Sequence, residues 1–189
     1  MEFENKLVVI ESPSKKYLSV ITTGQEFVTN EGKIEFNKIT SLPIRLESSI
    51  GTTFIIYVPS YKEFILLMKR GPQIIYPKDV GSIVVSANLN SHSKVLEIGT
   101  GSGALTLFIS SLLGPNSEFY SVDVNKKNQY RAKKTISRYI SNYSEEMTKK
   151  VNFINEDIST FSLESISVSF DSIITDVPEP WHFFSNNKI

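Results

Sequence analysis

Three glycines at alternate positions most constrain what this chain can fold into. Gly99, Gly101 and Gly103 separate the apolar run KVLEI from the run ALTLFISSLL, in which Leu105 and Ile109 belong to one helical stripe. Glycine lets the backbone turn tightly and approach a ligand closely. The first turn of a following helix has backbone N–H groups without intrahelical partners. The segment therefore predicts a buried strand, a tight turn and a helix whose N-terminus faces a ligand.

The chain around this turn alternates strand-like and helix-like patterns. Strands are expected at 94–98, 118–124, 151–157 and 171–177, and helices at about 79–87, 104–113 and 126–139. We expect Asp79 to cap the first of these helices, because Asp is a favoured N-cap residue. Such alternation predicts right-handed βαβ units, hence an α/β, Rossmann-like domain with a parallel sheet and helices on both faces.

The N-terminal third of the chain has a different sequence pattern. Its short segments rich in β-branched and aromatic residues favour strands, and turns are expected near Gly24 and Gly32. The strand-like segments read KLVVIES, YLSVITT, KIEFNKI and TFIIYVP. We therefore expect a small β-domain over residues 1–62, followed by the Rossmann-like domain over 63–189.

The composition excludes several classes of protein but does not indicate a binding partner. Twenty Lys and Arg balance twenty Asp and Glu, so net charge neither requires nor excludes RNA. The absence of cysteine excludes a disulfide framework and a cysteine nucleophile, and His92 and His182 lack neighbouring ligands, so no metal is expected. The start MEFENKLVVIES is acidic where a secretory signal is basic, and no apolar run could cross a membrane. A soluble cytoplasmic protein is expected.

Acidic residues lie at or just after the ends of all four strands expected in the Rossmann-like domain. They are Glu97, Asp123, Asp157 and Asp176. Ligands of parallel α/β sheets bind outside the carboxyl ends of the strands, so these side chains are expected around one site. The alternative for any single acid is that it only caps the helix that follows.

The spacing E-x-G-x-G-x-G differs from the G-x-G-x-x-G of dinucleotide-binding proteins. An acid two residues before the first glycine would repel a pyrophosphate, whereas it suits a cationic amino group. The pattern favours S-adenosyl-L-methionine over NAD(P) or a purely structural turn, and predicts a class I S-adenosylmethionine-dependent methyltransferase domain. Asp123 is then placed to accept from the ribose hydroxyls and Asp157 from the adenine amino group.

Three motifs together resemble the tRNA adenine-N1 methyltransferases, especially the archaeal enzymes that modify a T-loop adenosine. They are LLMKRGPQIIYPKDVGSI, VLEIGTGSGALTLFIS and DSIITDVPEPW, and the resemblance covers Pro59 to about Trp181. It implies methyl transfer to N1 of adenosine, tRNA as the partner and a homotetramer in the full-length form. The family continues past DVPEPW with a helix, a strand and a hairpin, so the methyltransferase domain is expected to be C-terminally incomplete.

The resemblance also implies roles for individual residues. Asp176 corresponds to the catalytic carboxylate beside the cofactor, while Gln73 and Tyr76 border the methyl-donor pocket. Tyr76 is a candidate wall for the flipped base, with Trp181 and Phe183 as weaker candidates, although it could instead be a core aromatic. The methionine end of the cofactor is expected at Glu97, Gly99, Thr100, Gly101, Ser102, Gly103 and Ala104, the ribose at Asp123 and the adenine at Asp157.

Two questions stay open at this level. The basic stretch Lys126–Arg138 contains no acid and is either a phosphate-binding surface or the solvated face of a helix. Lys69 and Arg70, just before the pocket motif, are stronger candidates for RNA contact. The whole chain is either the enzyme, a non-catalytic RNA-binding subunit of methyltransferase fold, or a methyltransferase for small molecules or proteins on the same scaffold.

Overall fold

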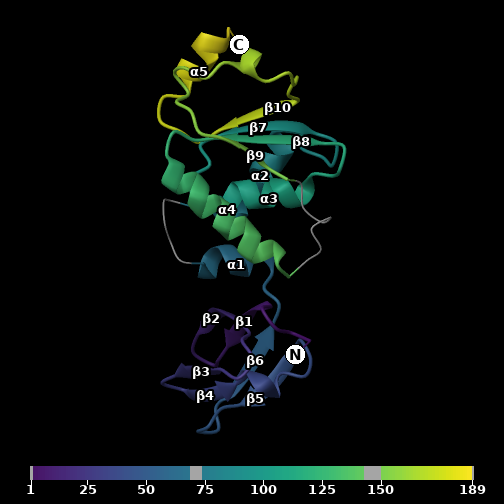
Figure 1. Ribbon diagram of the computed structural model, residues 1–189, viewed down its shortest axis with the longest axis vertical. Coiled ribbons are helices and arrows are strands. Elements are labelled where there is room, and N and C mark those ends of the chain that lie inside the picture. The colour runs from purple at the N-terminus through teal and green to yellow at the C-terminus, as the bar shows by residue number, and fades with distance from the viewer. Residues whose placement is uncertain (1, 69–73, 143–149, 189) are drawn as a thin grey trace. The chain divides into compact units, whose positions relative to one another are not determined.

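The computed structural model describes residues 2–68, 74–142 and 150–188, shown in Figure 1. The chain divides into two compact units, Met1–Lys69 with Ser141–Tyr143, and Arg70–Ile140 with Ser144–Ile189. The first unit extends beyond residue 62, where the sequence placed the boundary, because helix α1 (Tyr61–Leu67) belongs to it. None of the helices in the described ranges is long and apolar enough to span a membrane.

The first unit is built on an antiparallel sheet in the order β2-β1-β6-β5. These strands are β1 (Leu7–Glu11), β2 (Lys16–Val20), β5 (Ile44–Glu47) and β6 (Thr53–Tyr57), and β3 (Glu26–Thr29) with β4 (Gly32–Glu35) forms a separate hairpin. A short 3-10 helix, η1 (Phe36–Lys38), follows β4. Inward-facing residues such as Val8, Ile10 and Phe54 form the core of the unit. A small β-domain therefore forms, as expected, although β3 and β5 were not among the expected strands.

A polar cluster holds α1 against this sheet. Ser60 caps the helix in a reciprocal capping box with Glu63. The hydroxyl oxygen of Tyr57 lies 2.7 Å from a carboxylate oxygen of Glu63 and 2.7 Å from one of Glu11, so its single proton is shared between them, and it accepts from Nζ of Lys16 at 2.8 Å. Burial alone would raise the pKa of Glu63, but hydrogen bonds from Tyr57, Lys16 and Ser60 outweigh it and lower that pKa to about 2. Side chains from β1, β2, β6 and α1 thus meet in one network.

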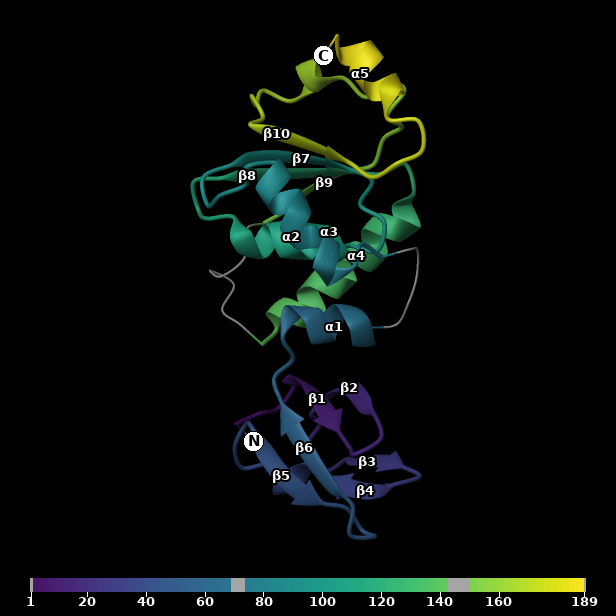
Figure 2. The ribbon, with the colours of Figure 1, turned by 180° about the vertical axis from the view of Figure 1, so that it is seen from behind.

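The second unit contains a wholly parallel sheet in the order β10-β7-β8-β9. The strands are β7 (Lys94–Ile98), β8 (Glu118–Val122), β9 (Asn152–Ile154) and β10 (Ser172–Thr175). One face is covered by α2 (Pro77–Ser86), α3 (Ala104–Leu112) and α4 (Lys126–Ile140), and the other by α5 (Trp181–Asn187), in both views of Figures 1 and 2. A 3-10 turn, η3 (Leu163–Ser165), precedes β10. The expected Rossmann-like architecture is confirmed.

The two faces of this sheet have separate apolar cores. Val80 of α2 and Ile109 of α3 pack with Phe119 on one face, while Leu96 packs with Phe183 of α5 on the other. Phe183 is fully buried, so the suggestion that it stacks on a substrate base is wrong. The local sequence did not indicate that Phe183 lies on the face of α5 that packs against the sheet.

The start of α2 differs from the expectation in one detail. Tyr76, not Asp79, occupies the N-cap position, and Asp79 lies within the first turn. Pro77 fixes this start, because proline is well suited to the first helical position, where its missing N–H is not needed. The helix therefore begins earlier than the sequence predicted.

Strand β7 marks the point at which the order of the parallel sheet reverses. The chain passes from β7 to β8 and β9 on one side and then returns to β10 on the other. In doubly wound sheets the crevice outside the carboxyl ends of strands at such a reversal is the usual ligand site. The topology therefore identifies the edge of the sheet on which to look for function.

Candidate active site

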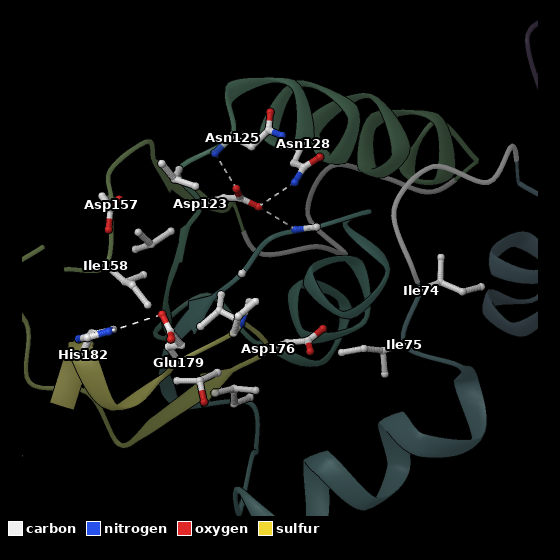
Figure 3. A pocket seen from close by; sticks show the side chains of 18 of the residues that line it. Ile74, Ile75, Asp123, Asn125, Asn128, Asp157, Ile158, Asp176, Glu179 and His182 are labelled. Atoms are coloured by element: carbon white, nitrogen blue, oxygen red, sulfur yellow. Dashed lines mark hydrogen bonds and ion pairs between the residues drawn. The ribbon is translucent and has the colours of Figure 1, made fainter. Parts of the chain in front are cut away.

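A pocket of about 1180 Å³ opens at the carboxyl ends of β7, β8 and β10 (Figure 3). Its walls come from the segment before α2, the glycine turn after β7, the loop after β8, the start of the loop after β9 and the loop after β10. The sequence-predicted site residues that line it are Tyr76, Gly99, Gly101, Asp123, Asp157 and Asp176. The fold thus brings together residues from five separate segments of the chain.

Glycine is required for a different structural reason at each of the three positions of the turn. A Cβ on Gly99, where φ is +100°, would lie 2.4 Å from the carbonyl oxygen of Asp176. A Cβ on Gly103, where φ is +79°, would lie 2.7 Å from Cα of Ala132 in α4. Gly101 has φ +52° and open space around its Cβ position, and it lines the pocket. Gly99 and Gly103 therefore allow close packing within the protein, whereas Gly101 leaves backbone accessible to a ligand.

Glu97 lies one layer behind the glycine turn and is not part of the pocket wall. It is 1% exposed, and its Oε2 accepts from Thr106 Oγ1 at 2.7 Å and from Ser121 Oγ at 2.6 Å. Its Oε1 is buried without a hydrogen-bond partner among the described residues. Burial raises the pKa of Glu97 to about 7, and the charges of Asp176 and Asp123 act in the same direction. Glu97 therefore titrates near neutral pH.

Asp123 links the end of β8 to the glycine turn. Its Oδ2 accepts from the backbone N–H of Gly101 at 3.0 Å, and its Oδ1 from the N–H of Asn125 at 2.7 Å. The side-chain amide of Asn128 approaches Oδ2 at 3.4 Å, as Figure 3 shows. Asp123 is mostly buried yet lines the pocket, so these bonds hold its carboxylate in a fixed position.

The remaining acids of the pocket are exposed. Asp157 accepts from the backbone N–H of Ser159 at 2.8 Å, and that hydrogen bond lowers the pKa of its carboxyl. Asp176 follows β10, and its backbone N–H donates to the carbonyl of Ile98 at 2.8 Å. No hydrogen bond to the Asp176 carboxylate comes from the part of the chain that the structure describes. Its position is thus set by the backbone, and its side chain is available within the pocket.

The other predicted residues are distributed as follows. Tyr76 is 43% exposed and lines the pocket, so it is not a core aromatic. Thr100, Ser102, Gly103 and Ala104 do not line the pocket, and Thr100 contacts Ser121 through a 2.6 Å hydroxyl hydrogen bond. Trp181 is 57% exposed but is not part of the wall. Gln73, Lys69 and Arg70 lie outside the described residues.

Sequence reasoning missed two parts of the wall. Asn125 and Asn128 border the pocket around Asp123, and asparagines just after a strand were the available signal. Glu179 and His182 also line the pocket, with His182 Nε2 3.6 Å from Glu179 Oε2. Glu179 has a left-handed backbone conformation, with φ at +57°. No group of three or more potential metal-ligating side chains occurs within residues 2–68, 74–142 and 150–188.

Comparison with known protein families identifies the family of this chain. Residues 54–188 match the family described as tRNA methyltransferase complex GCD14 subunit. The chain belongs to this family. Membership in the GCD14 family agrees with the resemblance seen in the three sequence motifs, which is thereby confirmed.

Individual relatives of this GCD14-family chain include archaeal and bacterial proteins. It is 28% identical over 202 residues to "tRNA (adenine(57)-N(1)/adenine(58)-N(1))-methyltransferase TrmI" of Methanocaldococcus jannaschii, covering 98% of this chain and 71% of that protein. The crystal structure of tRNA (m1A58) methyltransferase TrmI from Aquifex aeolicus is similar with a TM-score of 0.75 and 28% identity, covering 97% of this chain and 69% of that one.

A further solved structure supports the fold alone. A SAM-dependent O-methyltransferase from Thermotoga maritima is similar with a TM-score of 0.83 at 22% identity, covering 96% of this chain and 66% of that one. The fold of the second unit is therefore that of S-adenosylmethionine-dependent methyltransferases, as the glycine motif predicted.

Proposed function

We propose that this protein transfers a methyl group from S-adenosyl-L-methionine to N1 of a T-loop adenosine in tRNA. One observation carries the proposal. In a chain of the tRNA methyltransferase family, the Asp176 carboxylate lies in a pocket at the reversal point of the sheet, beside the glycine turn. We further propose that it acts in the cytoplasm and assembles as a homotetramer.

The pocket residues fit S-adenosylmethionine, which when bound supplies an electrophilic methyl group. Asp123 offers a fixed carboxylate for the ribose hydroxyls, and Asp157 offers an exposed one for the adenine amino group. Gly101 leaves the backbone open where the methionine end would approach. Glu97, buried behind the turn, makes no direct contact with the ligand, and a cationic amino group nearby would favour the ionised form of this carboxyl, whose pKa is about 7.

Asp176 has the chemistry required at the reacting base. N1 of adenine carries an in-plane lone pair, so it attacks a methyl group without a strong base to activate it. Positive charge then spreads toward the exocyclic amino group, and a carboxylate accepting a hydrogen bond from that group stabilises the charge. The same hydrogen bond selects adenine, because guanine has a carbonyl oxygen at the corresponding position.

Tyr76 is suited to hold the base once it has left its stack. Its ring is partly exposed in the same wall as Asp176, and the N-terminus of α2 fixes its backbone. Enzymes that act on a base extrude it and commonly stack it against aromatic or apolar side chains. Holding N1 in line with the methyl donor supplies much of the remaining rate enhancement.

The test is to incubate the protein with S-adenosylmethionine and an unmodified tRNA transcript, digest the RNA, and identify methylated nucleosides by mass spectrometry. The proposal predicts 1-methyladenosine, and no product when the T-loop adenosines of the transcript are replaced by guanosine. Methylation of another nucleoside, or equal methylation of the substituted transcript, contradicts it. Absence of product with the cofactor still bound also contradicts it and favours the non-catalytic subunit.

A further inference from the structure

Helix α4 carries its positive charges in an arrangement that lowers the stability of the helix itself. Six basic residues lie between Lys126 and Arg138, and this stretch contains no acid. Lys126 and Lys127 occupy the first turn, where the helix dipole disfavours cations. Lys127 and Arg131 are four residues apart, so their like charges repel. Because the chain as a whole is neutral, this local excess is not explained by composition.

The charges form a strip on one side of the helix. Lys127, Tyr130, Arg131 and Lys134 follow the i, i+3, i+4, i+7 spacing of a single helical face. All four are exposed, Tyr130 to 70%. The opposite face, which contains Ala132 and Ile136, is buried in the second unit. We refer to these four exposed residues as the basic strip.

The basic strip lacks the ion pairs that several lysines elsewhere in the described residues form. Lys16, Lys33, Lys38, Lys78 and Lys94 each form an ion pair with a carboxylate. Lys127, Arg131 and Lys134 form none with any residue in the described ranges. Their ammonium and guanidinium groups are therefore available to an external anion.

The basic strip starts at the rim of the pocket. Asn125 and Asn128 flank Lys127 in sequence, and both line the pocket. Val124, which is largely exposed, is also part of the pocket wall. From Lys127 to Lys134 the helix rises about 10 Å. A polyanion that places one unit in the pocket can thus follow the helix away from it.

We infer that the basic strip binds the phosphate backbone of the RNA whose target nucleotide enters the pocket. The inference rests on the proposed function. Arg131 and the two lysines neutralise phosphates, and Tyr130 offers an exposed ring on which a base or ribose can pack. An RNA backbone fits this strip better than an acidic protein does. An exposed aromatic side chain among lysines and arginines that form no ion pairs is typical of protein surfaces that bind nucleic acid.

The experiment compares two triple variants with the same change in charge. Lys127→Gln, Arg131→Gln and Lys134→Gln neutralise the basic strip, and Lys15→Gln, Lys33→Gln and Lys38→Gln neutralise three exposed lysines of the first unit. The affinity for unmodified tRNA transcript is measured over a range of salt concentrations. Binding of S-adenosylmethionine and the thermal unfolding midpoint are measured on the same samples.

The strip variant is expected to lose at least about tenfold in tRNA affinity at low salt, and the slope of log affinity against log salt is expected to fall by about two to three. The control variant retains most of both, and neither variant changes cofactor binding. Tyr130→Ala is expected to weaken binding several-fold without changing the salt slope. Because neutralisation removes repulsion within α4, the strip variant should be at least as stable as the wild type.

Four outcomes overturn the inference. Equal losses in both triple variants would mean that general charge, not this strip, attracts RNA. If the strip variant keeps the wild-type slope of log affinity against log salt, while the wild type still methylates tRNA, the inference is refuted but the proposed function stands. A change in oligomeric state on neutralisation identifies the strip as a contact between copies of the chain. If the wild type binds no tRNA at all, the proposed function fails as well.

Discussion

Substitution of Gly99 by alanine tests whether the glycine turn is built against the end of β10. The added Cβ would lie 2.4 Å from the carbonyl oxygen of Asp176 and 2.9 Å from Cγ1 of Val177. The first contact is with backbone, so it cannot be relieved by rotating a side chain. A non-glycine residue at positive φ costs about 1–2 kcal/mol, and overpacking a tight site costs about 1–3 kcal/mol. We therefore expect Gly99→Ala to lower the free energy of unfolding by about 2–5 kcal/mol.

The matched control is Gly101→Ala. Its φ of +52° is also positive, but the nearest atom to an added Cβ is 4.0 Å away, so only the backbone term of about 1–2 kcal/mol applies. Urea unfolding of both variants can be followed by the fluorescence of Trp181, the single tryptophan of the chain, which lies in the second unit. A Gly99→Ala protein as stable as Gly101→Ala would refute the reasoning, because the contact with β10 would then carry no energy.

Three further predictions concern titration, the first unit and the ligand site. The pKa of Glu97 rises from 4.5 to about 7 on folding, so as pH rises the unfolded chain loses this proton before the folded protein does. The free energy of unfolding should therefore fall by about 3 kcal/mol between pH 4.5 and pH 7. Glu97→Gln should abolish this pH dependence in urea titrations at several pH values. Tyr57→Phe removes the hydroxyl that joins Lys16 to two carboxylates and should cost the first unit about 1–2 kcal/mol, measured by thermal unfolding. Asp123→Ala removes the acceptor of the Gly101 N–H and should weaken S-adenosylmethionine binding by roughly tenfold or more in calorimetry; equal affinity would exclude Asp123 from the site.

Much of the second unit could be predicted because its signals are local. The KVLEI run, the alternate glycines and the amphipathic stripe after them determine a strand, a turn and a helix within a short stretch of chain. The rule that ligands bind at the carboxyl ends of parallel strands then brought Asp123, Asp157 and Asp176 to one pocket.

The observed arrangement differs from the expected one where contacts between residues distant in the sequence determine it. Glu97 lies behind the turn because Ser121 of β8 and Thr106 of α3 bind its carboxylate, and that register is not visible in the spacing of the loop. The buried position of Phe183 depends on which face of α5 meets the sheet. The left-handed backbone at Glu179, a non-glycine residue of the pocket wall, is also not predicted by local propensity.

The central claim is that the Asp176 carboxylate stabilises charge on the adenine base during methyl transfer, and one measurement tests it most directly. The single-turnover rate of 1-methyladenosine formation is compared between the wild type and Asp176→Asn at saturating cofactor and tRNA, with cofactor affinity measured in parallel. Asparagine keeps the size of the side chain but removes its charge. We predict a rate lower by roughly 10²–10³-fold with little change in cofactor affinity. An unchanged rate would contradict the account, because Asp176 would then not stabilise the reacting base.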